Sequence, residues 1–545
     1  MELVKDVLNR IPKNFINILI YSFIFGILCH GMIYFNIWPG HDNAPVYFME
    51  SKVSLLQGLG DTAAGGRFFQ SIISMIFYGE ANTPWLCGIV LMICCALAAW
   101  FTVDAFEIES AVWTIVLTAL FITNPFVLSV NCYTGNTYVF SVCIFLSCFS
   151  FWCFINNKDA AYWILLFVAV NTYASYGGVV LAFFVVYELR EIILDKNYNF
   201  SCGLKRHLKL VFTAGSAFVF SYGINIGLTK IFGVTAQSRV SDAIVDTNKG
   251  YKKAILTYAD RLKNLYKQVF YFFKDYVKGA PLYELCVRIC ILVVLILFFA
   301  FIVKQAKYYR PLNVCLLVVD IICLPICMNV ISTVWDSHSL MWFPFIALWI
   351  FIIAFCDRID TIREEKNRLI EYIVFSSLVL CLISCVHWTK LAHNAYTKTW
   401  ANYETGINLA NRIVYRIEDI DGYVKGETPV LFIGDIRKNY SRDESVIAFD
   451  TLDMFAGVGS YYPTAFTYMY PFFTFIRQEL CADMNIVNDK SSVMNNENLV
   501  MDLNSYGLNV TENDVMGLYD SLTCYPNKQC YTWYDGVLVF KVAEE

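Results

Sequence analysis

The chain has 545 residues, of which 57% are hydrophobic, 17% are aromatic and 16% are charged, with a mean hydropathy of +0.51. A soluble globular domain carries about 45–50% apolar and about 25% charged residues, so these values exclude a disordered chain and disfavour an ordinary soluble enzyme. The formal net charge of −5 gives no general attraction to nucleic acid. The composition therefore indicates a membrane protein.

Eleven apolar segments reach or approach the length of about 20 residues that a membrane-spanning helix needs. The first follows basic residues, as a signal peptide would, but it is too long for one and no small-residue cleavage site follows it. The fifth and sixth segments form either a pair split at Tyr176, Gly177 and Gly178 or one bent helix. The choice decides whether the number of membrane crossings is odd or even. In chain order, we expect helices at residues 15–36, 84–104, 111–130, 137–155, 160–174, 176–191, 209–230, 285–304, 312–332, 340–356 and 370–388.

The distribution of Lys and Arg favours about eleven crossings that begin in the cytoplasm, because short loops rich in these residues stay there. The short predicted outer loops at 131–136, 172–176 and 333–339 contain no Lys or Arg. One predicted inner loop, around Glu107, is acidic and gives no support. We expect the N-terminus inside and the C-terminus outside, with basic inner loops that contain Lys158, Arg190, Lys196, Lys205, Arg206, Lys209, Lys304, Lys307, Arg310, Arg358, Arg363, Lys366 and Arg368.

Three predicted outer regions are too long to be simple connections. Residues 37–83 separate the first two helices. Residues 231–284 contain apolar residues at helical spacing with Lys residues among them, which is typical of an amphipathic helix in the membrane interface. The third region is the tail from residue 389. We therefore expect a transmembrane domain at 1–388, followed by an extracytoplasmic domain at 389–545.

The tail is the part of the chain with a soluble composition. It contains strand-like runs at Val430–Ile433 and Val537–Phe540 and a helix-like stretch at Gly406–Ile417, which predict a small α/β domain. It contains no nucleotide-binding loop, Rossmann fingerprint or zinc-ligand spacing. Cys524 and Cys530 lie in a polar turn of the tail, where they can either form a disulfide outside the cell or remain thiols.

The acid Asp42 lies just outside the first predicted helix, in Trp38-Pro39-Gly40-His41-Asp42-Asn43. A carboxylate that is held and desolvated at the membrane surface can act as a general base on a sugar hydroxyl. The alternative is structural, since Asp is a good helix N-cap and the following Pro45 suits an early helical position. His41 and Asn43 are candidate substrate contacts, or ordinary polar residues of the interface.

Two arginines in the long outer regions are candidates for binding a lipid phosphate. Arg67 follows Gly65 and Gly66 and precedes an apolar stretch, and its guanidinium suits bidentate contact with phosphate. The two glycines suggest a close approach of the backbone. Arg239 begins the second long outer region and can hold a second phosphate. The alternative for both is a surface arginine that extends its charge into water.

The short outer loops contain polar side chains that suit sugar recognition. Tyr133 lies in the second outer loop, between Asn131 and Asn136. Asp336 and His338 lie in a later turn that has no other ionisable residue. Each has a structural alternative, because Tyr is typical of the aromatic belt at membrane interfaces and Asp is a common turn residue.

The order of these features resembles the bacterial type II glucosyltransferase family of the GT-C superfamily, which includes serotype-converting enzymes. The family usually has two adjacent acids after the first helix, whereas position 43 is Asn here, so Asp42 is available only as a single base. The resemblance covers nearly the whole chain and is carried by His41-Asp42-Asn43, Gly66-Arg67, Asn124-Pro125-Phe126, Pro429–Gly434, Tyr525-Pro526 and Asp535–Val539.

The resemblance implies a GT-C-like membrane enzyme of the bacterial cytoplasmic membrane. Its donor would be a polyprenyl-phosphate-linked sugar, expected to be glucose, and its acceptor a cell-surface glycan or a lipid-linked glycan on the outer face. The family pattern maps Asp42 to the acid of the first outer loop and Arg67 to the Gly-Arg pair. We expect Asp42 to be the base of an inverting displacement, with Arg67 and Arg239 on the donor phosphate, no cofactor, and membrane lipids as surroundings.

The main alternative is a transporter or flippase of lipid-linked sugars. Such a protein would show repeated hydropathy with broken helices at corresponding positions, and no clear repeat is visible in this sequence. Ionisable residues are also scarce within the predicted helices, where Asp320 is the main one, whereas ion-coupled transporters bury several as relays. The long outer regions and the large tail favour an enzyme.

Overall fold

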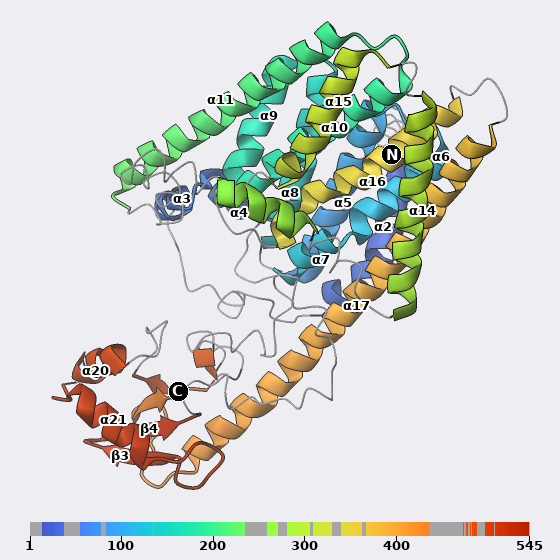
Figure 1. The fold of residues 1–545 in the computed structure, drawn as a ribbon. Coiled ribbons are helices and arrows are strands. Elements are labelled where there is room, and N and C mark those ends of the chain that lie inside the picture. The colour runs from blue at the N-terminus through green and yellow to red at the C-terminus, as the bar shows by residue number, and fades with distance from the viewer. Residues whose placement is uncertain are drawn as a thin grey trace, which may run out of the picture.

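The structure, a computed structural model, shows a helical bundle that one long helix joins to a small unit containing a β-sheet (Figure 1). The C-terminus lies in the small unit. The residues that the structure describes are 13–36, 55–77, 83–133, 136–234, 259–270, 281–305, 309–329, 339–361, 367–434, 472–473, 476–477, 480, 482–487, 496–505 and 507–543.

A helix occupies the main part of each apolar segment that the sequence singled out. Eight helices of the described residues are long and apolar enough to span a membrane. Three further helices, α9, α10 and α16, fall outside that group, so a multi-pass membrane protein is supported but the count of eleven stays a prediction. The bundle consists of α2 (Lys13–Tyr34), α5 (Pro84–Ala105), α6 (Ala111–Thr123), α7 (Pro125–Cys132), α8 (Thr137–Ile155), α9 (Asp159–Thr172), α10 (Gly177–Leu194), α11 (Phe200–Phe232), α14 (Pro281–Gln305), α15 (Pro311–Met328), α16 (Ala347–Thr361) and the first part of α17 (Arg368–Glu418).

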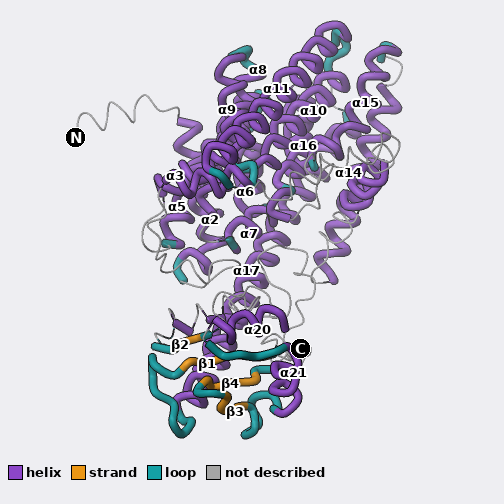
Figure 2. Tube along the Cα trace, turned by 90° about the vertical axis from the view of Figure 1, so that its left-hand side faces the viewer, coloured by secondary structure: helices purple, strands orange, loops and turns teal. Residues whose placement is uncertain are grey.

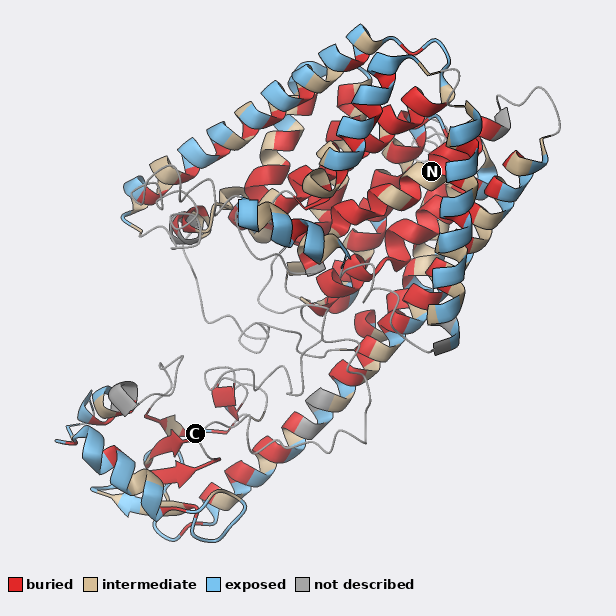
Figure 3. Cartoon of the chain, in the orientation of Figure 1, coloured by how far each residue is buried: buried red, intermediate tan, exposed pale blue. Residues whose placement is uncertain are grey.

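The outer helices of the bundle carry apolar side chains on their exposed faces. Phe212 of α11, Phe299 of α14 and Ile321 of α15 are 73%, 69% and 54% exposed. Figure 3 shows these outward faces in pale blue, whereas the inner helices are mostly red. Exposed apolar surface of this extent marks a contact with lipid or protein. The burial pattern therefore agrees with a bundle whose outer helices face lipid.

The segment at 160–191 forms two helices, α9 and α10, joined by a short 3-10 turn at Ala174–Tyr176. Lys209 pairs with Asp159 at 2.5 Å, near the beginning of α9, and Asn225 donates to Asn171 at 3.0 Å, near its end. Helices α9 and α11 therefore run in the same direction, so α10 must cross the bundle between them in the opposite direction. The prediction of a pair is confirmed over that of one bent helix.

The loops of the bundle gather at two opposite ends. At one end, which we call the basic end, Arg190 donates to the carbonyl of Phe106 at 2.5 Å, and Asn313 donates to the carbonyl of Tyr198 at 3.1 Å. Asp357 also accepts there from two backbone amides at 109–110, both at 3.0 Å. These contacts join loops that the sequence predicted on one side of the membrane.

The opposite end, which we call the Tyr34 end, contains the predicted outer turns. Asn131 donates to Tyr34 at 3.2 Å, and Tyr176 donates to the carbonyl of Leu340 at 3.3 Å. Two short helices, α3 (Leu55–Ala64) and α4 (Phe68–Phe77), lie at this end near the last turn of α11 (Figure 1). The alternation of loops along the chain therefore agrees with the predicted order of inner and outer connections.

Helix α17 leaves the bundle and enters the small C-terminal unit. It has 51 residues, which corresponds to a length of about 76 Å. Its first part packs on α2, α6, α14 and α16, and its last part forms one wall of the core of the small unit. The predicted domain boundary at residue 388 falls inside this helix, and the division into two domains stays a prediction.

The small unit is built on a four-stranded sheet in the order β2-β1-β4-β3, with β3 antiparallel and the other neighbours parallel (Figure 2). Successive side chains of a strand face opposite sides. Phe432 and Phe540 therefore pack in the core under α17, while Leu431 and Val539 pack in the core under α20 and α21. The elements are β1 (Pro429–Ile433), β2 (Asn485–Ile486), β3 (Tyr531–Tyr534), β4 (Val537–Lys541), α20 (Asn496–Ser505) and α21 (Glu512–Ser521).

The predicted strands at 430–433 and 537–540 are confirmed, and they are adjacent and parallel. The Cys524–Cys530 turn leads into β3, and the thiol of Cys530 is completely buried in the core under α17. No disulfide joins Cys530 to Cys524 in the structure. Of the two alternatives left by the sequence, the structure contains the thiols.

Candidate functional site

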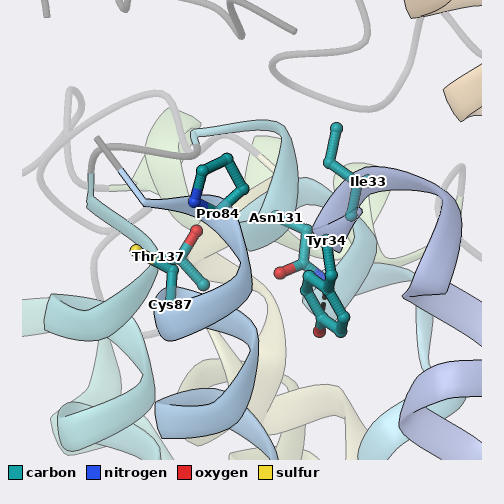
Figure 4. A pocket seen from close by; sticks show the side chains of 6 residues that line it. All are labelled: Ile33, Tyr34, Pro84, Cys87, Asn131 and Thr137. Carbon is teal, nitrogen blue, oxygen red and sulfur yellow. Dashed lines mark hydrogen bonds between the residues drawn. The ribbon is translucent and has the colours of Figure 1, made fainter. Parts of the chain in front are cut away.

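A narrow recess opens at the Tyr34 end, where four helices of the bundle meet (Figure 4). It encloses about 160 Å³ of space that is partly open to solvent. None of this space has room for a water molecule, so the recess encloses no ligand in this structure. Its lining residues come from α2, α5, α7 and α8, and they are Ile33, Tyr34, Pro84, Cys87, Asn131 and Thr137.

Two of the lining residues belong to a buried polar network. Asn131 Nδ2 donates to the hydroxyl of Tyr34 at 3.2 Å and to the hydroxyl of Tyr396 at 3.4 Å. Tyr396 lies 2.6 Å from Nδ1 of His30, and His30 Nε2 lies 2.9 Å from the carbonyl oxygen of Ile122. His30 and Tyr396 are completely buried, and Tyr34 and Asn131 are 5% and 1% exposed.

The partners of His30 determine where its protons lie. A carbonyl oxygen can only accept, so His30 Nε2 must donate to Ile122. Burial among apolar helices disfavours a charged imidazole, so His30 is neutral and its Nδ1 accepts. Tyr396 therefore donates its proton to His30 and can only accept from Asn131. Because Tyr396 can only accept, the NH₂ group of Asn131, and not its oxygen, faces the two tyrosines.

One acceptor and one proton of the network are unused within the part of the chain that the structure describes. The side-chain oxygen of Asn131 is buried without a hydrogen bond. The hydroxyl of Tyr34 accepts from Asn131, and none of the described contacts uses its proton. In Figure 4 the Asn131 oxygen points away from the Tyr34 hydroxyl, toward the side of the recess formed by Cys87 and Thr137. The recess therefore offers one acceptor and one donor.

Local sequence features hold Tyr34 and Asn131 in place. A Cβ atom at Gly88 would lie 2.6 Å from the ring of Tyr34, so only glycine leaves room for that ring on α5. Asn131 lies on α7, which begins where Pro125 disfavours further extension of α6. Asn124 caps α7 by accepting from the amides of Phe126 and Val127 at 3.0 and 3.2 Å. The predicted Asn124-Pro125-Phe126 motif thus sets the position of Asn131.

Arg67 lies between α3 and α4, directly after a helix C-cap. Gly66 has φ +74°, and the amides of Gly66 and Arg67 donate to the carbonyls of Ala63 and Thr62 at 2.9 and 2.8 Å. These bonds form a Schellman motif, which favours glycine at the left-handed position. The sequence suggested a close approach of the backbone at Gly65 and Gly66, whereas the structure shows that Gly66 provides the left-handed position of a helix C-cap.

The side chain of Arg67 lies over an aromatic ring rather than against an acid. Its guanidinium carbon is 5.5 Å from the centre of the Tyr173 ring, a cation–π distance. Within the described residues, no carboxylate lies at ion-pair distance from Arg67. The half-buried cation is therefore available to an anion. Tyr173 in turn contacts Phe140 and Tyr176, with ring centres 5.0 and 6.0 Å apart.

The surface beside Arg67 is apolar. Helix α4 begins directly after it, and Ile72, Met75 and Ile76 of α4 are 36%, 55% and 70% exposed. On the opposite face of α4, Ile73 packs in a cluster with Cys87, which also lines the recess. The Tyr34 end thus combines a cation, an exposed apolar strip and a buried polar network on adjoining elements.

Of the predicted site residues, Arg67 and Tyr133 lie in the described part of the chain. Tyr133 caps the end of α7, where its carbonyl accepts from Asn136 and Thr137 at 2.8 and 3.3 Å, and it is not among the residues that line the recess. The other candidates lie outside the described residues, and these are His41, Asp42, Asn43, Arg239, Asp336 and His338.

Chain connectivity limits where those residues can be. Asp42 comes six residues after Asn36, Arg239 five residues after Val234, and His338 directly before Ser339. Asn36 follows α2 beyond Tyr34, the segment after 339 contacts Tyr176, and the end of α11 packs on α3. All three attachment points belong to the Tyr34 end.

Sequence reasoning missed three members of the polar network, namely His30, Tyr34 and Tyr396. The signal for the first two is their spacing of four residues, which places them on one face of an otherwise apolar helix. Tyr396 fell in the tail that was assigned to a separate domain. Its contact with His30 joins residues 366 positions apart, for which a single sequence carries no local signal.

The comparison with known families gives one match. Residues 31–355 match the model of a family described as "Glucosyl transferase GtrII". The matched range contains the whole recess and Arg67, whereas Tyr396 lies beyond it. No curated protein and no solved structure matches the chain.

Proposed function

The chain belongs to the GtrII glucosyl transferase family, because the family model covers more than half of it, and from this premise we propose which donor it uses and where transfer occurs. The membership supports a glycosyltransferase in a multi-pass membrane protein. We propose that the donor is glucose linked to polyprenyl phosphate and that the acceptor is a cell-surface or lipid-linked glycan. The proposed site is the Tyr34 end of the bundle.

The observation that carries the proposed donor is the neighbourhood of Arg67. An amphiphile with a phosphate head and a long apolar tail needs a cation beside an exposed apolar surface. Arg67 and the exposed face of α4, formed by Ile72, Met75 and Ile76, provide both within a few residues. A soluble nucleotide sugar would gain nothing from the apolar face. A guanidinium also matches the oxygens of a phosphate in a bidentate contact.

The proposed chemistry is a single displacement at the anomeric carbon. The acceptor hydroxyl forms the new bond to this carbon while the bond to the phosphate oxygen breaks, which inverts the anomeric configuration. Asp42 takes the proton of the acceptor hydroxyl as a general base. Arg67, with Arg239, stabilises the negative charge that develops on the leaving polyprenyl phosphate. Asn36, six residues before Asp42, belongs to the Tyr34 end, which supports this assignment.

We propose that the basic end faces the cytoplasm and the Tyr34 end faces outward. The loops of the basic end carry an excess of Lys and Arg, which is typical of cytoplasmic loops. This orientation places the N-terminus in the cytoplasm and the C-terminal unit outside, in the cytoplasmic membrane of a bacterium. Donor and acceptor would then meet on the outer face, where nucleotide sugars are not supplied.

The donor is tested with purified protein in proteoliposomes that contain the glycan acceptor fraction. Radiolabelled glucose is offered either on polyprenyl phosphate or on a nucleoside diphosphate, and label in the glycan is measured. We expect transfer from the polyprenyl donor and none from the nucleotide donor. Transfer from the nucleotide sugar alone would overturn the proposed donor, and movement of the intact lipid-linked sugar without transfer would identify a flippase.

A further inference from the structure

The C-terminal unit presents a basic and aromatic surface near the end of α17. Arg412 and Arg416 lie four residues apart on one face of this helix. The guanidinium carbon of Arg416 lies 5.5 Å from the centre of the Tyr531 ring on β3. Trp533 faces the same side of β3 as Tyr531 and is 40% exposed. We call these four residues the Arg416 patch.

The two arginines of the patch carry charge that no acid compensates in the part of the chain that the structure describes. Both donate to backbone carbonyl groups instead of carboxylates. Arg412 Nε donates to the carbonyl of Asn408 at 3.1 Å, and Arg416 Nη2 donates to the carbonyl of Lys528 at 3.5 Å. Like charges four residues apart on a helix repel each other and destabilise it. An anion bound beside both guanidinium groups would relieve this repulsion.

The aromatic rings of the patch narrow the chemistry of that anion. A guanidinium makes bidentate contacts with a carboxylate or a phosphate. The exposed indole of Trp533 offers an apolar face with a polar N–H at its edge. The C–H face of a sugar ring packs on such a face, whereas an inorganic anion would gain nothing from it. A glycan that carries acidic groups would use both the arginines and the rings.

The position of the patch favours a long ligand over a lipid headgroup. Tyr396 contacts Asn131 at the Tyr34 end, and α17 continues from there into the small unit (Figure 1). Arg412 comes sixteen residues after Tyr396, which corresponds to about 24 Å along the helix. This distance separates the patch from the ends of the bundle helices. A chain of several sugars can extend from the proposed transfer site to the patch, whereas a single sugar cannot.

We infer that the Arg416 patch binds an acidic glycan chain, which is the acceptor of the proposed transfer. Arg412 and Arg416 hold a carboxylate or phosphate group of the chain, and Trp533 packs on a sugar ring beside it. This inference rests on the proposed function and deepens it, because it names the class of acceptor and the surface that holds it. The patch would retain the chain while its reacting hydroxyl lies at the Tyr34 end.

The test measures binding of glycans to the full-length protein in phosphatidylcholine nanodiscs by calorimetry. The probes are a galacturonic acid oligosaccharide and its methyl ester, which has the same backbone without charge. We expect the acid to bind more tightly than the ester. Arg412→Gln/Arg416→Gln should raise the Kd of the acid about three- to tenfold, because each exposed charge contact contributes little alone, and leave the ester unchanged. Trp533→Leu should raise the Kd of both.

Two matched variants serve as controls. Lys425→Gln removes a cation of the same unit that already pairs with Glu418 at 3.4 Å. Trp400→Leu removes an indole of α17 that is 43% exposed, which is similar to Trp533. We expect both variants to bind the acid as the wild type does. Arg412→Gln alone is a second test variant, because it keeps every contact of Arg416 with β3.

The outcomes separate the inference from the proposed function, since binding is measured without a donor. Equal Kd values for acid and ester in the wild type, or an unchanged Kd in the double arginine variant, would overturn the inference and leave the proposed function intact. Flotation of the nanodiscs with phosphatidylglycerol liposomes, lost in the same variant and without binding of the acid, would assign the patch to lipid headgroups instead. Absence of transfer from the polyprenyl donor would overturn the proposed function, whatever the Kd values.

Discussion

Tyr396 on α17 lies 2.6 Å from His30 on α2, and this contact joins the helix that leads to the C-terminal unit with the first helix of the bundle. The same tyrosine accepts from Asn131 of the recess at 3.4 Å. Both contacts are buried. Helix α17 therefore supplies part of the candidate site from outside the range that matches the family model.

Tyr396→Phe should destabilise the bundle and weaken transfer. The substitution leaves His30 Nδ1 without a donor and removes one acceptor of Asn131, so we expect a loss of about 1–3 kcal/mol in unfolding free energy. Chemical unfolding in detergent, followed by tryptophan fluorescence, measures it. Tyr415→Phe on the same helix is the control, because Tyr415 is 68% exposed. An equal effect of both substitutions would contradict the role of the network.

Gly88→Ala should displace Tyr34. The added methyl group would lie 2.6 Å from the tyrosine ring, so we expect a destabilisation of about 1–3 kcal/mol and a clear loss of transfer. Gly223→Ala is the matched control, since a Cβ atom there meets nothing within 4 Å and alanine favours a helix by up to about 1 kcal/mol. Thermal unfolding in detergent compares the two variants. A neutral Gly88→Ala would show that the ring position is not constrained.

Arg67→Ala should weaken use of the lipid-linked donor. Loss of a charged contact to phosphate corresponds to about 1.5–3 kcal/mol, or roughly ten- to a hundredfold in kcat/KM for the donor. Steady-state kinetics against donor concentration measures this change. Arg358→Ala at the basic end is the control, because its guanidinium lies 3.5 Å from the exposed carboxylate of Glu107, a pair expected to contribute little. Unchanged donor kinetics in Arg67→Ala would remove Arg67 from the site.

Asp42→Asn should abolish transfer while expression and donor binding stay normal. The amide keeps the size of the side chain but cannot accept the proton of the acceptor hydroxyl, and general base catalysis contributes about 10²–10⁴-fold. Transfer of label to the glycan and retention of labelled donor on the purified protein are measured in parallel. Activity near that of the wild type would show that Asp42 is not the base. It would favour the helix-capping alternative.

The sequence was sufficient to locate the helices because length and apolar composition are local properties. The segment at 111–130 was predicted as one helix, whereas the structure divides it into α6 and α7 at the Asn124-Pro125 pair, which disfavours further extension of α6. The C-terminal boundary of the transmembrane domain was harder to predict from the sequence. The residues after 388 become polar, although the helix that contains them continues to Glu418. A change in composition therefore resembled a change of domain.

The site was only partly predictable. Arg67 was identified because a glycine pair before an arginine is a local pattern, but the left-handed cap at Gly66 was not foreseen. The contacts of Asn131 with Tyr34 and Tyr396, and of Tyr396 with His30, were not, because they depend on packing between helices far apart in the chain. Tertiary contacts of this kind leave no periodic signal in one sequence.

The position of the donor is the central claim, and photolabelling tests it most directly. A polyprenyl phosphate with a diazirine near its phosphate is incorporated with the full-length protein into liposomes and irradiated, and labelled peptides are identified by mass spectrometry. The account predicts labelling of residues 55–77, beside Arg67 and the exposed face of α4, with competition by unlabelled polyprenyl-phosphate glucose. Competed labelling confined to the basic end, around Arg190 and Arg310, would contradict it.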